Sequence, residues 1–173
     1  MIINIQRYDM KDNLWAPWRM QYVTNPDKGK NIFLEKSKSE NDRENLVLYR
    51  ASKSFILMNL YPYNNGHLLI APYEQHNDIT YLDPETLNEI MQLTQTAIQI
   101  LKDKLKSDGF NFGLNMGKAA GAGIDEHLHF HIVPRWIGDS NFMPIVGQTE
   151  VIMQGLYDTY DLLKPEFDLL NKL

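Results

Sequence analysis

The chain has 173 residues, 43% of them hydrophobic, which suits one globular domain with a sizeable core or one domain with terminal extensions. Its formal charge of -5 at pH 7 and its pI near 5.5 argue against a nucleic-acid-binding surface and against a polybasic membrane anchor. Because the chain has no cysteine, a disulfide framework, a cysteine-type zinc site and a thiol nucleophile are excluded.

No apolar run approaches the roughly 18 residues that a membrane-spanning helix needs. The first ten residues also lack the charged-then-apolar order of a secretory signal peptide. We therefore expect a soluble, cytoplasmic protein that binds neither membranes nor nucleic acids. A small basic pocket for a phosphorylated ligand is compatible with the acidic overall charge.

Residues 1–45 are mostly polar but include Trp15 and Trp18. The large apolar area of these side chains favours a role in anchoring this arm to the core. The alternative is that Trp18 and Arg19 form part of the rim of a binding site. The stretch 25–45, rich in Lys, Ser, Glu, Asn and Asp, is typical of an extended surface loop.

Three short apolar runs follow at residues 46–49, 55–59 and 67–72, and turn-forming residues separate them. We expect these runs to form three antiparallel strands. Asp83 and Pro84 then predict the start of a long helix, with Asp83 as the N-cap and Pro84 at the first helical position.

Apolar residues recur at helical spacing from Leu87 to Leu105, and Gly109 is predicted to end this helix as a C-terminal cap. Residues 110–116 and 127–133 are predicted as a fourth and a fifth strand, which gives the element order β-β-β-α-β-β. In the tail, helical spacing over residues 149–163 predicts a second helix that Pro165 limits.

Three of the five histidines stand at alternate positions in the predicted fifth strand: His127, His129 and His131. Side chains of a strand alternate between its two faces, so the three imidazoles are expected to share one face while the residues between them face the core. Three interpretations are open: histidines with structural hydrogen bonds, a zinc site with three histidine ligands, or histidines that act on a phosphorus.

The loop just before these histidines favours phosphoryl chemistry. Residues 117–123 are Gly-Lys-Ala-Ala-Gly-Ala-Gly, small residues of the kind whose backbone N–H groups surround phosphate oxygens. This segment is not a P-loop, because it lacks the glycine spacing before Lys118 and the Ser or Thr after it. A neutral imidazole beside such a loop can attack a bound phosphorus, since the ordinary pKa of histidine leaves a large neutral fraction near pH 7.

These segments resemble a known family. Residues 127–133, His-Leu-His-Phe-His-Ile-Val, look like the signature of the histidine triad (HIT) nucleotide hydrolases and transferases. Residues 64–76 resemble the same family's Gly-His-x-Leu segment, which places His67 and His76 as well. Residues 14–20 and 134–144 look like the branch that cleaves diadenosine polyphosphates, which includes bacterial phosphorylases of diadenosine tetraphosphate.

The resemblance implies an α+β fold of the HIT type, with a five-stranded antiparallel sheet, a long helix and a C-terminal helix. It also implies a homodimer with a continuous sheet and a small-molecule nucleotide as the substrate. The chain then divides into an N-terminal arm and loop (1–45), the HIT domain (46–147) and a C-terminal helical tail (148–173), which together make one structural domain.

The resemblance also implies roles for single residues. His129 takes the place of the nucleophile that forms a nucleotidyl-histidine, which water or phosphate then resolves. His127 would orient it, together with His67, and His131 would contact the phosphate or the leaving oxygen. The implied nucleotide-binding positions are Asn59 at the ribose and Asn115, Gly121, Ala122, Gly123 and Ile124 at the phosphates, with Phe33, Phe55 and Leu57 either near the base or simply in the core.

Some positions depart from relatives within the family. Gly123 stands where the phosphoramidase branch commonly has Gln, and Asp125 and Glu126 occupy the approach to the triad, where they could repel a phosphate, tune the histidines or face solvent. The cysteines of zinc-carrying members are absent, so we expect no metal and no cofactor. The alternatives to dinucleoside polyphosphate cleavage are a purine nucleoside phosphoramidase, a non-catalytic nucleotide-binding protein and a metal-dependent enzyme.

Overall fold

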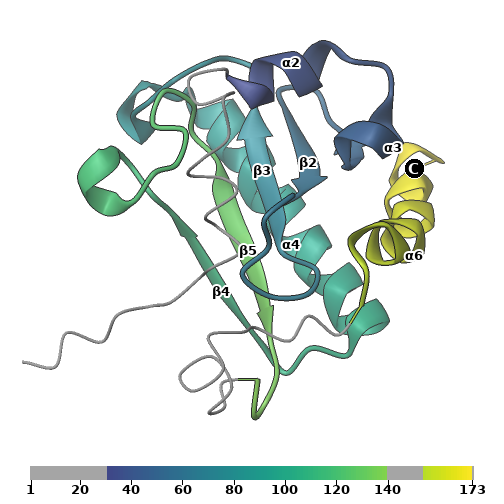
Figure 1. Cartoon of the computed structure of the whole chain (residues 1–173). Coiled ribbons are helices and arrows are strands. Elements are labelled where there is room, and N and C mark those ends of the chain that lie inside the picture. Colours follow the sequence, from purple (N-terminus) through teal and green to yellow (C-terminus); the bar gives the residue numbers. More distant parts are fainter. Residues whose placement is uncertain (1–30, 140–153, 173) are drawn as a thin grey trace, which may run out of the picture.

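The computed structural model describes residues 31–139 and 154–172, which form a five-stranded antiparallel sheet with helices packed on it (Figure 1). The strand order is β1-β2-β3-β5-β4. This arrangement confirms the predicted α+β class and the β-β-β-α-β-β order. The strands are β1 (Val47–Arg50), β2 (Ser54–Met58), β3 (Leu68–Pro72), β4 (Gly109–Leu114) and β5 (Phe130–Arg135).

Helix α4 covers one face of this sheet, α2 packs on the other face, and α3 and α6 lie at one edge. Figure 1 shows α4 running behind the sheet, while α6 and α3 lie beside its β1 edge. None of the described helices is long and apolar enough to cross a lipid bilayer. The helices are α2 (Ile32–Lys38), α3 (Asp42–Asn45), α4 (Pro84–Leu105) and α6 (Leu156–Asp168), with 3-10 turns η1 (Ile79–Tyr81), η2 (Lys118–Ala120) and η3 (Leu169–Lys172).

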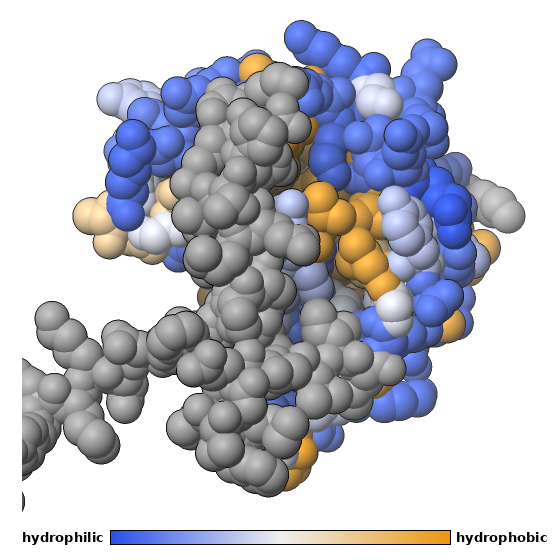
Figure 2. Space-filling view, viewed as in Figure 1, coloured by the Kyte–Doolittle hydropathy of each residue, from blue (hydrophilic) through white to orange (hydrophobic). Residues whose placement is uncertain are grey.

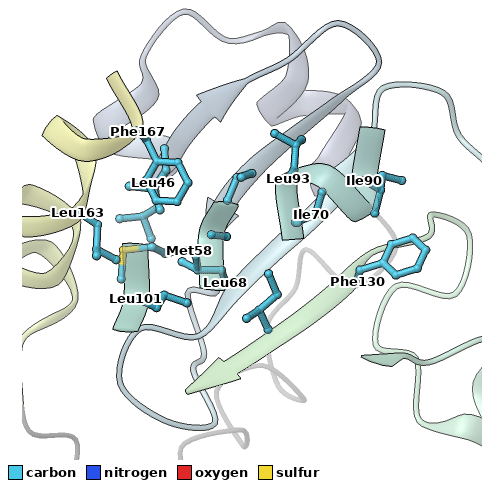
Figure 3. Close-up of a cluster of buried hydrophobic side chains, with 14 of the residues drawn as sticks. Leu46, Met58, Leu68, Ile70, Ile90, Leu93, Leu101, Phe130, Leu163 and Phe167 are labelled. Carbon is cyan, nitrogen blue, oxygen red and sulfur yellow. The ribbon is translucent and has the colours of Figure 1, made fainter. Parts of the chain in front are cut away.

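The main hydrophobic core lies between the sheet and the helices α4 and α6 (Figure 3). Leu101 of α4 and Leu163 and Phe167 of α6 are fully buried there against side chains of the first three strands. The N-terminus of α4 is capped as predicted, because the Asp83 carboxylate accepts hydrogen bonds from the Glu85 and Thr86 N–H groups at 3.0 Å each.

The prediction of an extended loop over residues 25–45 is wrong for the part that the structure describes, because α2 and α3 lie in it. The Asn31 side chain caps α2 by accepting a hydrogen bond from the Leu34 N–H at 3.2 Å, and the helix buries Phe33. A helix of seven residues with one buried side chain is too short for helical periodicity to reveal it.

The predicted end of the long helix at Gly109 is also wrong. Lys106 takes the left-handed conformation at the C-cap, with φ 52° and ψ 40°, and Gly109 begins β4. The Trp136 indole N–H lies 3.1 Å from the Lys106 carbonyl oxygen, so a residue distant in sequence satisfies an acceptor at this helix end.

The C-terminal helix continues through Pro165 to Asp168, although Pro165 was predicted to limit it. A proline inside a helix removes one backbone hydrogen bond. Here the turn that contains it buries Phe167 completely, and this burial outweighs the loss. The helix begins at Leu156, because Gln154 is not helical and Gly155 is the N-cap, so the predicted helix over residues 149–163 starts too early. Residue 149 itself lies outside the described residues. The division of the chain at residues 45 and 147 stays a prediction.

The fifth strand begins at Phe130 and not at residue 127. The backbone before it bonds elsewhere, because the Leu128 N–H donates to the His76 carbonyl at 2.7 Å. The alternation of side chains is nevertheless as predicted. Leu128, Phe130 and Ile132 belong to the main core, so the histidines between them point to the opposite face of the sheet.

Candidate active site

The sheet places His67 and His131 next to each other. Leu69 of β3 pairs with His131 of β5, and His67 stands two residues before Leu69, so the two histidines are diagonal neighbours on one face. Nε2 of His67 lies 2.9 Å from Nδ1 of His131. The sheet register brings His67 to His131, and the suggested part of His67 in orienting His129 stays a prediction.

The hydrogen bonds of His67 fix the position of its proton. Its Nδ1 accepts a hydrogen bond from the Tyr63 N–H at 3.0 Å, and the Asn59 amide nitrogen lies 3.3 Å from the same atom. In the neutral ring, Nε2 then carries the proton and donates it to Nδ1 of His131. The neutral His131 ring in turn carries its proton on Nε2.

His127 and His129 are held by backbone carbonyls. Nδ1 of His129 lies 2.8 Å from the His127 carbonyl oxygen, and a carbonyl only accepts, so Nδ1 carries the proton. The neutral His129 ring thus keeps its lone pair on Nε2. In the same way, Nε2 of His127 donates to the Pro72 carbonyl at 2.8 Å, and its Nδ1 accepts from the Asn31 amide at 3.1 Å.

Both rings are buried, and burial disfavours the charged form. Desolvation lowers the pKa of His127, although the hydrogen bond to Pro72 acts in the opposite direction, and desolvation also lowers the pKa of His129. The ring centroid of Phe33 lies 5.2 Å from that of His127 and 4.8 Å from that of His129. An apolar side chain thus excludes water from one side of both imidazoles and keeps them neutral near pH 7.

Of the residues implied at the ribose and at the phosphates, Asn59 and Asn115 lie next to histidines. Asn59 contacts His67, as described above, and its side-chain oxygen accepts from the Tyr61 N–H at 3.0 Å. Asn115 follows Leu114, whose partner in β5 is Phe130, so Asn115 and His129 occupy the next positions along the two strands. Gly113 pairs with His131 and leaves open space where a side chain would stand.

The loop before the triad is mostly exposed. Gly117 and Gly121 have positive φ angles of 74° and 83°, a conformation that glycine adopts without strain. Ile124 packs against the second hydrophobic cluster, which contains Phe33. Lys118 Nζ lies 3.6 Å from an Asp125 carboxylate oxygen, so Asp125 faces a lysine, while Glu126 is exposed.

Other candidates fall into three groups. Phe33, Phe55 and Leu57 are at most 1% exposed, as the core-packing alternative predicts. Trp18 and Arg19 lie outside the described residues. Within residues 31–139 and 154–172, no three His, Cys, Asp or Glu side chains are grouped so that they could hold a metal ion.

Sequence reasoning missed two contributors to the site. Asn31 contacts His127 across 96 positions of the chain, and no local pattern indicates such a contact. Tyr63 stands in the segment between the second and third apolar runs, and its ring stacks on His131 at a centroid distance of 5.8 Å and an angle of 12° between the planes. Its position four residues before His67, inside a segment rich in aromatic residues, is the one available signal.

The chain is similar to several known proteins. An AP-4-A phosphorylase of Mycobacterium tuberculosis (strain ATCC 25618 / H37Rv) is 39% identical over 167 residues, which cover 92% of this chain and 86% of that protein. A bis(5'-adenosyl)-triphosphatase of Dictyostelium discoideum is 30% identical over 93 residues, which cover 54% of this chain and 62% of that protein.

Solved structures agree with the fold. A Zn-bound histidine triad family protein from Mycobacterium smegmatis matches with a TM-score of 0.60 and 25% identity, over 73% of this chain and 86% of that one. Plasmodium falciparum diadenosine triphosphate hydrolase matches in fold, with a TM-score of 0.59 and 22% identity over 82% of this chain and 95% of that one. The family model described as HIT domain matches residues 40–136, and the chain belongs to this histidine triad family.

Proposed function

We propose that this protein is an enzyme that cleaves a phosphoanhydride bond of dinucleoside polyphosphates of the diadenosine tetraphosphate type. The observation that carries the proposal is the hydrogen bond from His129 Nδ1 to the His127 carbonyl, which keeps the lone pair on Nε2. Similarity to relatives named for AP-4-A phosphorylase and bis(5'-adenosyl)-triphosphatase activity supports this substrate class.

The reaction begins when Nε2 of His129 attacks the phosphorus next to one nucleoside. A phosphorus–nitrogen bond forms, and the phosphorus–oxygen anhydride bond breaks with its electron pair on the departing nucleotide. His131 carries its proton on Nε2 because His67 donates to its Nδ1. This N–H stabilises the negative charge that develops on the leaving oxygen.

The second step releases the nucleotidyl group from His129. An oxygen of the acceptor attacks the same phosphorus, the phosphorus–nitrogen bond breaks, and the neutral imidazole returns. We infer that orthophosphate is the acceptor, because the phosphorylase relative matches 92% of the chain. Diadenosine tetraphosphate and orthophosphate then yield ATP and ADP, and no metal or cofactor takes part in these steps.

The binding surface suits a nucleotide. Asn59 would bind a ribose hydroxyl, while Asn115 and the loop residues Gly121, Ala122, Gly123 and Ile124 would line the phosphates with amide groups. Figure 2 shows hydrophobic side chains gathered on the face where β2 and β3 lie, inside a rim of hydrophilic residues. Leu60, which follows Asn59, is 50% exposed and offers an apolar contact for the nucleoside.

The test is product analysis by ion-exchange chromatography with diadenosine tetraphosphate, with and without orthophosphate and without added metal. ADP and ATP that form only with phosphate support the phosphorylase. AMP and ATP without phosphate mean that water is the acceptor. Absence of cleavage in both samples contradicts the proposal, and adenosine phosphoramidate then tests the phosphoramidase alternative, while AMP binding without any turnover indicates the non-catalytic one.

His129→Asn tests the nucleophile. We expect turnover to fall by roughly 10³-fold or more, because loss of a covalent nucleophile removes the first step. Binding of a non-cleavable analogue, measured by calorimetry, should stay close to wild type. His76→Asn is the matched control, since His76 lies outside the triad and its ring pairs with Glu74 at 3.3 Å. A His129→Asn variant with more than a tenth of the wild-type rate would show that the nucleophile is another group.

A further inference from the structure

Asn31 makes two hydrogen bonds that together fix the orientation of its side-chain amide. Its Oδ1 accepts from the Leu34 N–H at 3.2 Å, which caps α2. Its Nδ2 lies 3.1 Å from Nδ1 of His127. A flipped amide would turn its NH2 group toward the Leu34 N–H and lose the cap, so the N–H that faces His127 is set by the fold of α2.

This orientation decides the protonation state of His127. The Pro72 carbonyl requires a proton on Nε2 of His127, and the Asn31 amide requires a lone pair on Nδ1. An imidazolium carries a proton on Nδ1 as well. Its Nδ1–H would then face the N–H of the Asn31 amide, and two donors cannot form a hydrogen bond. The carbonyl of the same residue holds His129, so the position of His127 determines the position of the ring that attacks.

We propose that Asn31 is a positioning residue of the active site: it holds His127 as the neutral Nε2–H tautomer and thereby fixes the residue whose carbonyl orients His129. The role of His129 as nucleophile rests on the proposed function. A phosphate-rich substrate beside these rings favours imidazolium, and Asn31 opposes that change by donating to Nδ1. Among the described residues, the titratable groups that act on His127 are His129 in the same segment and His76 in the loop after β3, and Phe33 of α2 adds an uncharged ring.

Two substitutions separate this role from the capping of α2. Asp and Ser are N-cap residues about as good as Asn, so Asn31→Asp and Asn31→Ser should keep α2 and the thermal stability of the protein. Asn31→Asp places an acceptor against Nδ1 and draws a proton onto it, which makes His127 an imidazolium. Asn31→Ser is too short to donate to the ring and leaves Nδ1 without its donor.

The first readout is a long-range ¹H–¹⁵N correlation spectrum of histidine side chains, in which the five rings are assigned with His→Gln variants. We expect a proton on Nε2 alone of His127 in the wild type and protons on both nitrogens in Asn31→Asp at pH 7. The second readout is turnover: kcat should fall about tenfold or more in both variants with KM changed less, as misplacement of a reacting group predicts. In Asn31→Asp, kcat should recover in part as the pH rises and His127 loses the added proton.

A proton on Nδ1 of wild-type His127, or a wild-type kcat in Asn31→Ser, would overturn the proposal. The spectrum needs no substrate, so this test is independent of the proposed function. A wild-type protein that cleaves no dinucleotide refutes the proposed function, while the spectrum still decides whether Asn31 sets the tautomer of His127.

Discussion

Three histidines of one segment have three different hydrogen-bonding environments, and each environment gives its ring a different chemical task. His127 donates from Nε2 to a carbonyl, His129 donates from Nδ1 to a carbonyl, and His131 accepts at Nδ1 from another imidazole. In the neutral rings, Nε2 of His127 and Nε2 of His131 each carry a proton, whereas Nε2 of His129 carries a lone pair. In the proposed reaction, one side-chain type thus supplies both the nucleophile and the donor for the leaving oxygen.

The pH dependence of the first step follows from the neutral rings. Burial lowers the pKa of His127 and of His129 below the usual value of 6.5, so both rings stay unprotonated until the pH falls below that value. We expect kcat/KM for the dinucleotide to be constant from about pH 8 to pH 6.5 and to decrease only at lower pH. This parameter covers the steps up to release of the first nucleotide, so titration of the phosphate acceptor does not affect it.

The measurement is a pH–rate profile at low substrate concentration, with His76→Asn to show that the fifth histidine does not cause the acidic limb. An acidic limb centred above pH 6.5 would contradict the assignment of neutral, buried rings to the attacking site. A protein that unfolds in this pH range would give the same loss, so circular dichroism at each pH is the necessary control.

The histidines could be found from the sequence because they stand close together at alternate positions. Their partners could not be found in that way. His67 and His131 are 64 positions apart, and Asn31 and His127 are 96 positions apart, so strand register and helix docking bring them together. The contact of His67 with His131 could not be predicted for this reason, because family likeness alone does not give the register of β3 against β5.

The helices and strands were predicted where local chemistry determines them. The N-cap Asp83 followed by Pro84 gives the start of α4, and alternation gives the five strands to within three residues. The predictions are wrong at helix ends whose position depends on contacts with residues distant in the sequence. Trp136 satisfies the end of α4, and the burial of Phe167 carries α6 past Pro165. A sequence window of a few residues contains neither contact.

One buried hydrogen bond joins α6 to β1, and its removal should lower the stability of the protein. The Tyr160 hydroxyl donates to the Val47 carbonyl at 3.0 Å, and the side chain is 2% exposed. Burial raises the pKa of Tyr160 to about 12, so the hydroxyl stays protonated and able to donate at any working pH. Tyr160→Phe should lower the free energy of unfolding by about 1–2 kcal/mol, since a buried carbonyl loses its partner.

Denaturant unfolding measures this difference, and Tyr157→Phe is the matched control because Tyr157 lies on the same helix and is 43% exposed. Equal stability of the two variants would mean that the hydrogen bond to β1 does not hold α6 in place. The kinetic constants of Tyr160→Phe should equal those of the wild type, because neither α6 nor β1 contributes a residue to the triad.

At the scale of the whole molecule, the two faces of the sheet have different surroundings. The face toward α4 carries the main core, and the other face carries the histidines together with the second hydrophobic cluster, which contains Phe33. On that second face α2 brings the Phe33 ring against the rings of His127 and His129, while β4 presents the exposed residues Asn111 and Gly113. In the described part of the chain, exposed residues of β4 thus lie on one side of these histidines and the apolar ring of Phe33 lies on another.

The two edges of the sheet differ, and the difference predicts how copies of the chain associate. The β1 edge packs against α3 and α6, whereas β4, six residues long, is the edge strand in the described part of the chain, with Phe112 exposed by 43%. Met116, just beyond the strand, is exposed by the same fraction. Unpaired N–H and C=O groups on such an edge pair readily with a second strand. We expect a homodimer in which two β4 strands pair antiparallel around a twofold axis, which gives the continuous sheet that the family likeness implies.

Phe112→Glu tests this arrangement, because Phe112 is exposed in the single chain and a charge there opposes its own copy across the axis. Light scattering should give twice the chain mass of 20.2 kDa for the wild type and the single mass for the variant, with unchanged circular dichroism. Leu162→Glu is the control, because Leu162 lies on α6 and is 39% exposed, and this variant should remain a dimer. A monomeric wild type at micromolar concentration rules out the dimer, and a dimeric Phe112→Glu shows that another surface forms it. Because β4 also carries Gly113 beside His131, loss of the β4 pairing is expected to raise KM for the dinucleotide more than it lowers kcat.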